Sequence, residues 1–374
     1  MRVEGEMAYL YIYDLGGEVD PSRIRDLVRA TPTERWRSLL APEFVKISPS
    51  PLSMDLGNYG ASVRGSSVRV SLEARIYSIG AISIIARVPI RCSFEELVDY
   101  SSPKGLQVEY GDRPHALGEF AREHFERVSQ TIKPYITATY PREEEPEEYT
   151  VFCIKSIGAD FKSELFIREN RAAIAGLLRE MDPQKVSAGA AEEATRFFLS
   201  YYFDDLVVVD WDASFIVDPS GDFMDYVQTM ELANMQLLVL RVYDEHLTRL
   251  IDKAYDDVRY FSRASPLSIL AGRRLGKVVA ELAETRIEMS ELYESTMNIT
   301  KFFGDWALAR LYSLLRERMH LREWTDSVSE KLHVLEDLYQ MAYDKSNAAR
   351  LEMLEIVIVL LILFEVIFAL IRSV

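Results

Sequence analysis

The chain has 374 residues, 48% of them hydrophobic and 27% charged, which is enough apolar material for a sizeable folded core. Its net charge of −16 argues against nonspecific nucleic-acid binding and against a docking surface for anionic lipids, because both use basic patches. The two cysteines, Cys92 and Cys153, lie in apolar strand-like runs, which indicates buried free thiols in a reducing compartment rather than a disulfide or metal site.

The N-terminal region begins with a strand signal followed by a helix signal. Residues 7–13 are apolar and aromatic and predict a strand, whereas Asp20 and Pro21 have the residue types that begin a helix. Residues 41–65 are rich in Pro, Ser and Gly and predict a loop with one short strand at residues 44–47. The acidic, aromatic-rich start is typical of neither a secretory signal nor a transit peptide, so we expect the body to stay in the cytoplasm.

Two strands and two helices are predicted next. Residues 67–78 alternate apolar and polar side chains, as a half-buried strand does, and residues 81–90 are apolar enough for a central strand. Ser93 and Glu96 have the spacing of a capping box, which predicts that a helix begins there. Another helix is expected near residues 113–132.

An acidic, Pro-bounded run at residues 141–148 predicts a linker within this body. A strand at residues 149–157 and a helix at residues 163–180 follow. Two further strands, at residues 196–203 and 206–217, complete the pattern.

The predicted fold class of residues 1–220 is therefore α+β. The element order β-α-loop-β-β-α-β resembles a ferredoxin-like, split βαβ sandwich.

The pattern becomes helical over residues 223–350. Apolar side chains recur there at alternating spacings of four and three, which predicts a coiled coil. The residues that carry this spacing are Val328, Leu332, Leu335, Tyr339 and Ala342. Because no helix breaker occurs from residue 321 to residue 370, we expect one helix roughly 75 Å long, part of which serves as a stalk.

The segment 351–371, between Arg350 and Arg372, is almost entirely apolar. A helix of about 21 residues crosses the roughly 30 Å hydrocarbon layer of a bilayer. Its apolar side chains favour insertion by on the order of 5 to 10 kcal/mol, whereas one central acid costs about 2.5 to 3.5 kcal/mol. We expect a single transmembrane helix that acts as a tail anchor. The alternative is an apolar helix buried in the core of a soluble oligomer.

Three acids and one base of this region are the candidate membrane and oligomer contacts. Glu352 and Glu355 are expected near the entering interface, and Glu365 deep in the bilayer, where an acid normally faces a partner helix or a wet cavity. Arg350 is expected to pair with Glu352 or with the Glu355 of a neighbouring copy. Lys345 and Arg350, compared with Arg372 after the segment, favour a cytoplasmic body by the positive-inside rule.

No catalytic, cofactor or metal site is predicted with any specificity. Asp210 and Asp212 are expected on the same face of one strand, where they could hold a divalent cation, although a solvated strand face is the simpler interpretation. The five histidines are scattered, and the sequence has neither of the glycine-rich loops that bind nucleotide phosphates.

Two segments resemble the family named "required for meiotic nuclear division". The first is residues 230–247, and the second runs from Trp306 to an Arg-Leu-Glu run at Arg350 that leads into an apolar segment with a late acid, Glu365. At Met353 the chain departs from the tryptophan usual there. The resemblance implies membrane association without an assigned catalytic site. Mitochondrial members are linked to translation in that organelle, but this chain lacks their presequence, so a prokaryotic origin is expected.

The sequence therefore predicts a membrane-anchored, oligomeric interaction protein that is not an enzyme. Its expected partners are further copies of itself through the helices, the lipid bilayer and an unidentified protein, but not nucleic acid. One alternative is a metal-dependent enzyme or regulator that uses Asp210 and Asp212. Another is an ion conductor of the type with a long helix entering the membrane, which the single predicted span disfavours.

Overall fold

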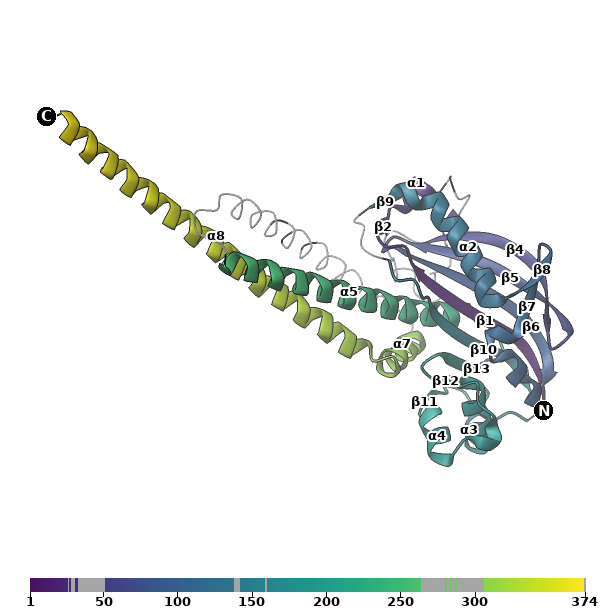
Figure 1. Cartoon of the computed structure of the whole chain (residues 1–374). Helices are drawn as coiled ribbons and strands as arrows, with labels where there is room; N and C mark the ends of the chain where they lie inside the picture. The colour runs from purple at the N-terminus through teal and green to yellow at the C-terminus, as the bar shows by residue number, and fades with distance from the viewer. Residues whose placement is uncertain are drawn as a thin grey trace. The chain divides into compact units, whose positions relative to one another are not determined.

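The computed structural model describes residues 1–25, 27, 31–32, 51–137, 142–158, 160–263, 280, 283, 287 and 306–372 (Figure 1). The chain divides into two compact units, Met1–Val242 with Thr296–Trp324, and Tyr243–Ser295 with Thr325–Val374. The predicted short strand at residues 44–47 lies outside the described residues.

The first unit is built on an eleven-stranded sheet. Its strands are β1 (Arg2–Asp14), β3 (Thr31–Pro32), β4 (Leu52–Val63), β5 (Ser66–Tyr77), β6 (Ala81–Ser93), β7 (Leu106–Tyr110), β8 (Arg113–Ala116), β10 (Glu147–Ile157), β11 (Phe197–Leu199), β12 (Leu206–Val209) and β13 (Ala213–Val217). Ten of them lie in the order β11-β12-β13-β10-β1-β6-β5-β4-β7-β8, and β3 pairs with β4. Separately, β2 (Glu18–Val19) pairs with β9 (Ile136–Thr137).

Helices lie on both faces of this sheet. The first unit contains α1 (Pro21–Ile24), α2 (Leu117–Ile132), α3 (Ser163–Leu178), α4 (Ala188–Ala194) and α7 (Trp306–Arg318). Its 3-10 turns are η1 (Glu95–Tyr100), η2 (Pro103–Gly105), η3 (Lys133–Tyr135) and η4 (Pro183–Lys185). Two long helices, α5 (Met224–Arg263) and α8 (Leu321–Arg372), each contribute residues to both units.

The central strand β1 is buried on both faces, which explains its unbroken apolar and aromatic sequence. Tyr9 and Tyr11 lie in one core cluster with buried residues of α2, α3 and η1. Ala8 and Leu10, on the opposite face, lie in a second cluster with buried residues of α5 and α7. Since successive side chains of a strand point to opposite faces, the first unit has a helix layer on each side of the sheet.

The second unit contains a packed pair of helix segments, from α5 and α8. Asp244 of α5 accepts a hydrogen bond from Ser327 of α8 at 2.6 Å and forms a 2.7 Å ion pair with Lys331 of α8. Val328 and Leu335 are buried within the single chain, at 0% and 1% exposure. The predicted coiled-coil stalk is not confirmed and stays a prediction.

The mixed α+β class and most of the predicted strands of the body are confirmed. The predicted strands at residues 67–78, 81–90 and 149–157 correspond to β5, β6 and β10. The capping box is also present, since the Ser93 N–H donates to Glu96 at 2.7 Å and the Glu96 N–H donates to Ser93 at 3.3 Å, although the element it begins is a 3-10 turn.

Other element predictions are wrong. Residues 52–63, expected to be mainly loop, form β4, which pairs with both β5 and β7 and has a bulge next to Gly57, whose φ is +103°. The predicted strand at residues 206–217 is a hairpin of β12 and β13. The ferredoxin-like arrangement is not confirmed, because the sheet is much larger and β1 pairs antiparallel with both of its neighbours.

Candidate functional site

The end of α8 forms an apolar helix that is exposed along its whole length. Leu351–Arg372 contains 22 residues, has a mean hydropathy of 3.0 and is 0% buried within the protein. Its length and composition are sufficient to cross a membrane. A continuous apolar surface of this size marks a contact with lipid or with protein, because soluble monomers rarely leave one in water.

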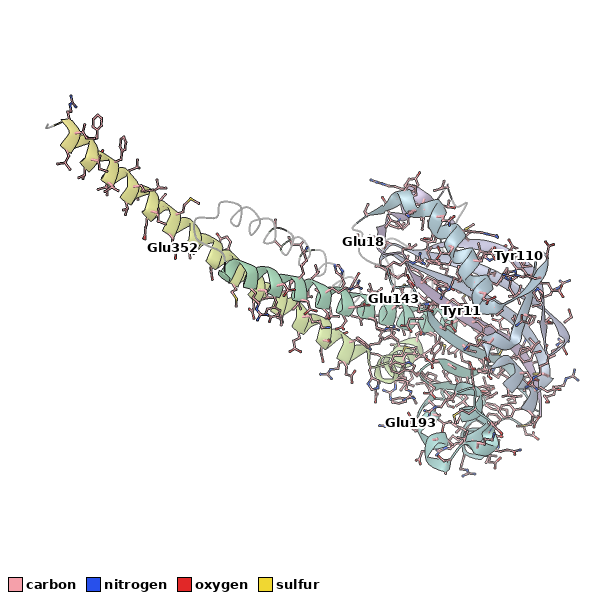
Figure 2. All side chains as sticks on the ribbon, in the orientation of Figure 1. Tyr11, Glu18, Tyr110, Glu143, Glu193 and Glu352 are labelled. Atoms are coloured by element: carbon pink, nitrogen blue, oxygen red, sulfur yellow. The ribbon has the colours of Figure 1, made fainter. Side chains whose placement is uncertain are left out.

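The predicted contact residues all belong to this part of α8. Glu352, Glu355 and Glu365 are exposed, and Glu352 stands near the start of the apolar segment (Figure 2). Arg350 belongs to the same helix, but its side chain lies outside the described part of the structure, so its pairing stays a prediction. The three acids therefore lie on one exposed helix, and the groups that they contact in another molecule stay a prediction.

Glu365 is the acid that lies farthest from the ends of the segment. It lies beside Phe364, Phe368, Ala369 and Arg372 on the open surface of the helix. Arg372 follows it by two helical turns and therefore lies on nearly the same face of the helix. Within the described residues Glu365 forms no ion pair or hydrogen bond, so this face has an acid that is available to another molecule.

The two aspartates considered for a metal site flank a turn. Asp210 follows β12 and Asp212 precedes β13, so their predicted placement on the same face of one strand is wrong. The Asp210 N–H donates to the Ala213 carbonyl at 2.8 Å, and the Asp210 carboxylate accepts the Trp211 N–H at 2.9 Å. An aspartate that bonds to its own turn in this way stabilises a hairpin, which the alternating pattern did not reveal.

Asp210 is neutralised by two arginines. It is 2% exposed, and it accepts hydrogen bonds at 2.7 Å from Nε of Arg179 on one carboxylate oxygen and from Nε of Arg318 on the other. Arg318 also forms a 2.8 Å ion pair with Glu193. We call Asp210, Arg179, Arg318 and Glu193 the Asp210 cluster. It joins the ends of α3 and α7 to the β12–β13 turn.

The Asp210 cluster does not have the character of a cation site, since a metal ion would have to displace two guanidinium groups. Burial, with Asp210 and Glu180 nearby, also raises the pKa of Asp212 above its ordinary value and so favours its neutral form. Among the residues that the structure describes, no group of three or more His, Cys, Asp or Glu side chains could hold a metal ion.

A second polar cluster, which no sequence pattern predicted, lies between the sheet and α5, with only Glu73 partly exposed. Arg75 of β5 and Glu231 of α5 are 2% and 0% exposed and form an ion pair of 2.6 Å. The Tyr77 hydroxyl donates to Glu231 at 2.8 Å, and Arg75 Nε donates to Glu73 at 2.9 Å. We call these four residues the Arg75 cluster. The only sequence signal was a single acid within the apolar run of α5.

The acid–base properties of the Arg75 cluster follow from its burial and pairing. Burial alone would raise the pKa of Glu73, but the charge and hydrogen bond of Arg75, together with the Ser53 hydroxyl and the charge of Arg87, more than offset it, so this pKa is lowered. Burial disfavours the charge on Arg75, whereas Glu231, Tyr77 and Glu73 together raise its pKa. Glu73 and Arg75 are therefore held in their charged forms, and the contacts of Arg75 and Tyr77 with Glu231 fix α5 to the sheet.

Both cysteines are free thiols, as the sequence predicted. Cys153 is buried and Cys92 is half-buried. Burial, with Glu96 and Asp99 nearby, raises the pKa of Cys92 to about 11. Because the thiolate is the reactive form, neither position has the surroundings of an activated nucleophile.

Residues 4–224 match the protein family described as "Uncharacterized protein MJ0711, N-terminal domain". The chain is also 30% identical over 258 residues to the uncharacterized protein MJ0711 of Methanocaldococcus jannaschii, a match that covers 69% of this chain and 75% of the relative. No solved structure matches the chain. The resemblance to the family "required for meiotic nuclear division" is not tested by these matches and stays a prediction.

Proposed function

The chain belongs to the MJ0711 family, and we propose that it is a membrane-anchored interaction protein whose α+β unit is held at a bilayer by the end of α8. One observation carries this proposal. Leu351–Arg372 is a 22-residue apolar helix with no buried part, which a lipid environment would satisfy along its whole length.

The energetics favour insertion even though the segment contains acids. Its apolar side chains supply on the order of 5 to 10 kcal/mol, and Glu365 costs about 2.5 to 3.5 kcal/mol if it lies near the bilayer centre. Glu352 and Glu355 lie close to the start of the segment, where acids cost less. Lys345 and Arg350 before the segment favour a cytoplasmic position for the α+β unit.

Self-association is better assigned to the apolar segment than to the predicted coiled-coil positions. Val328 and Leu335 are buried within the single chain, so they have little surface left for another copy. Glu365, in contrast, is exposed on a helix proposed to lie in lipid, where a polar side chain gains most by contacting another helix. The oligomer therefore forms through the membrane segments.

Removing the apolar segment is expected to release the protein from membranes. The full chain should remain in the membrane pellet after extraction with alkaline carbonate, whereas a chain stopped at Ser346 should appear in the supernatant. Circular dichroism of the shortened chain is the control that the α+β unit is still folded. A full chain that leaves the pellet, and sediments without detergent as a discrete soluble particle, would contradict the anchor.

Substituting Glu365→Leu is expected to leave insertion intact and to weaken the oligomer. Interhelical hydrogen bonds in membranes contribute about 0.6–2 kcal/mol each, so the dissociation constant in detergent should rise about threefold to thirtyfold. Sedimentation equilibrium in detergent measures this, with Glu365→Gln as the control that keeps a polar group able to hydrogen-bond to another helix. An unchanged dissociation constant for Glu365→Leu would exclude Glu365 from the contact.

No observation favours the alternative functions. Both carboxylate oxygens of Asp210 are bonded to arginines, which counts against a metal-dependent activity at Asp210 and Asp212. An ion conductor of the type considered has two spans in each chain, whereas the described residues contain one candidate span.

A further inference from the structure

The sheet divides into two branches between β5 and β6. The two strands pair antiparallel as far as Ser71 and Arg87, and no pairing between them continues past these residues. Beyond this point β5 stays paired with β4, and β6 stays paired with β1. The same register would set Arg69 opposite Pro89, which has no N–H to donate, so the ladder cannot continue there.

We call the opening between residues 66–70 of β5 and residues 88–92 of β6 the fork. In a paired strand about half of the backbone polar groups face each neighbour. The groups of both branches that face the fork have no backbone partner across it among the described residues. Each branch therefore presents a sheet edge, the kind of surface to which an extended chain adds by main-chain hydrogen bonds.

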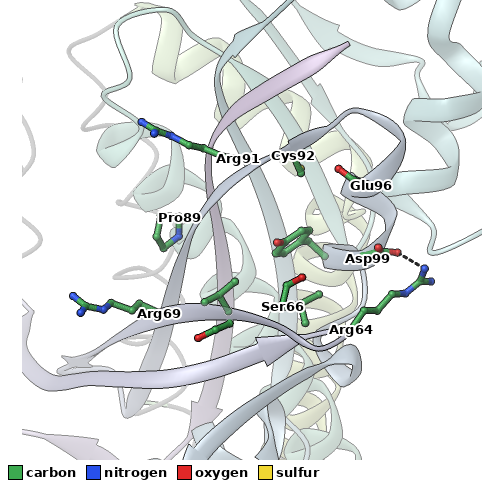
Figure 3. A pocket seen from close by; sticks show the side chains of 12 residues that line it. Arg64, Ser66, Arg69, Pro89, Arg91, Cys92, Glu96 and Asp99 are labelled. Atoms are coloured by element: carbon green, nitrogen blue, oxygen red, sulfur yellow. Dashed lines mark ion pairs between the residues drawn. The ribbon is translucent and has the colours of Figure 1, made fainter.

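A cavity of about 640 Å³ lies in the fork (Figure 3). One side of it is basic. Arg69 and Arg91 project to the same side, on which Pro89 also lies. Arg91 is paired with Glu4 at 2.6 Å, in contact with solvent, whereas Arg69 has no ion pair with any described residue. An acidic side chain in the cavity would therefore meet at least one uncompensated guanidinium group.

The other side of the cavity is more apolar and is closed by η1. Val68, Cys92 and Tyr100 line it. The Tyr9 hydroxyl donates to the Tyr100 carbonyl at 2.7 Å, which fixes this turn against the sheet. Two acids also line the cavity, on the side away from Arg69 and Arg91 (Figure 3). Asp99 is paired with Arg64 at 2.9 Å, whereas Glu96 accepts a hydrogen bond from the Ser93 N–H at 2.7 Å.

We propose that the fork binds an extended acidic segment of a partner polypeptide, which adds as a strand to the free edge. Alternate side chains of a strand point to opposite faces, so acidic residues would meet Arg69 and Arg91 while apolar residues between them would pack toward Val68 and Tyr100. The net charge of −16 does not oppose this, because salt screens charges beyond about 8 Å at physiological ionic strength. The inference rests on the proposed interaction role and gives it a ligand class.

The test uses the full chain in detergent and a fluorescent peptide of alternating glutamate and valine, with binding followed by anisotropy. Saturable binding is expected, and a lysine–valine peptide should not bind. Arg69→Glu should weaken the affinity at least about tenfold, whereas Arg113→Glu, the same charge change on exposed β8, should leave it unchanged. Equal losses for the two variants would overturn a specific site.

A second peptide separates strand addition from simple anion binding. Methylating alternate backbone nitrogens on one edge of the acidic peptide should abolish binding, and binding of the unmodified peptide should slow amide exchange over residues 66–70 and 88–92. Undiminished binding of the methylated peptide would overturn strand addition. Since neither readout depends on the membrane, failure here is distinct from failure of carbonate extraction.

Discussion

Substituting Glu231→Ala is expected to lower the free energy of unfolding by about 3–5 kcal/mol. Glu231 is 0% exposed and binds both Arg75 and Tyr77. Alanine would leave the Arg75 guanidinium buried with only Glu73 as counter-ion, and the Tyr77 hydroxyl would lose its acceptor. Urea denaturation followed by near-ultraviolet circular dichroism measures the change.

A matched pair on the neighbouring strands isolates the effect of burial. Arg87 and Glu6 form an ion pair of the same 2.6 Å length, but their side chains are 18% and 32% exposed. Glu6→Ala should therefore cost less than about 1 kcal/mol. Similar losses for Glu231→Ala and Glu6→Ala would show that burial of the Arg75 cluster is not what makes it important.

The elements that could be predicted from the sequence are those whose signal is local. β1, β6 and β10 have long apolar runs because both of their faces are covered, and the apolar segment of α8 is defined by composition alone. β4 was missed because its glycines and its bulge at Gly57 interrupt the alternation that marks a strand. β4 is positioned by its pairing with β5 and β7, and a local sequence pattern cannot predict pairing between distant segments.

The polar clusters could not be predicted because their members are far apart along the chain. Arg75 and Glu231 are separated by 156 positions, and Asp210 and Arg318 by 108. In the sequence, each of these charged residues is indistinguishable from a charged residue on the surface. Only the packing of α5 and α7 on the sheet brings the charges together. The fork could not be predicted for the same reason. Pro89 indicates that strand pairing is interrupted at its position, but it does not indicate which strand would lie opposite.

Substituting Asp210→Ala is expected to cost on the order of 3 kcal/mol of unfolding free energy and to loosen α7. The loss is smaller than the upper range for a fully buried pair because Arg179 and Arg318 are 27% and 15% exposed and can be partly hydrated. Arg318 is the last residue of α7, so removing its acceptor frees that end of the helix from the β12–β13 turn. Amide exchange along α7 should accelerate more than exchange in β1.

Glu193→Ala is the control for Asp210→Ala. It tests whether α7 is attached to the β12–β13 turn by the buried Asp210 carboxylate or by the total negative charge of the Asp210 cluster. Glu193 bonds to the same two arginines but is 47% exposed, at the surface of the first unit (Figure 2). Its removal leaves Asp210 as the one acid paired with both guanidinium groups, and water can stabilise the remaining positive charge because both arginines are partly exposed. The cost should therefore stay below about 1 kcal/mol, with no faster exchange in α7. If Glu193→Ala accelerates exchange in α7 as much as Asp210→Ala does, the attachment of this helix depends on summed charge rather than on the buried, two-sided contact with Asp210.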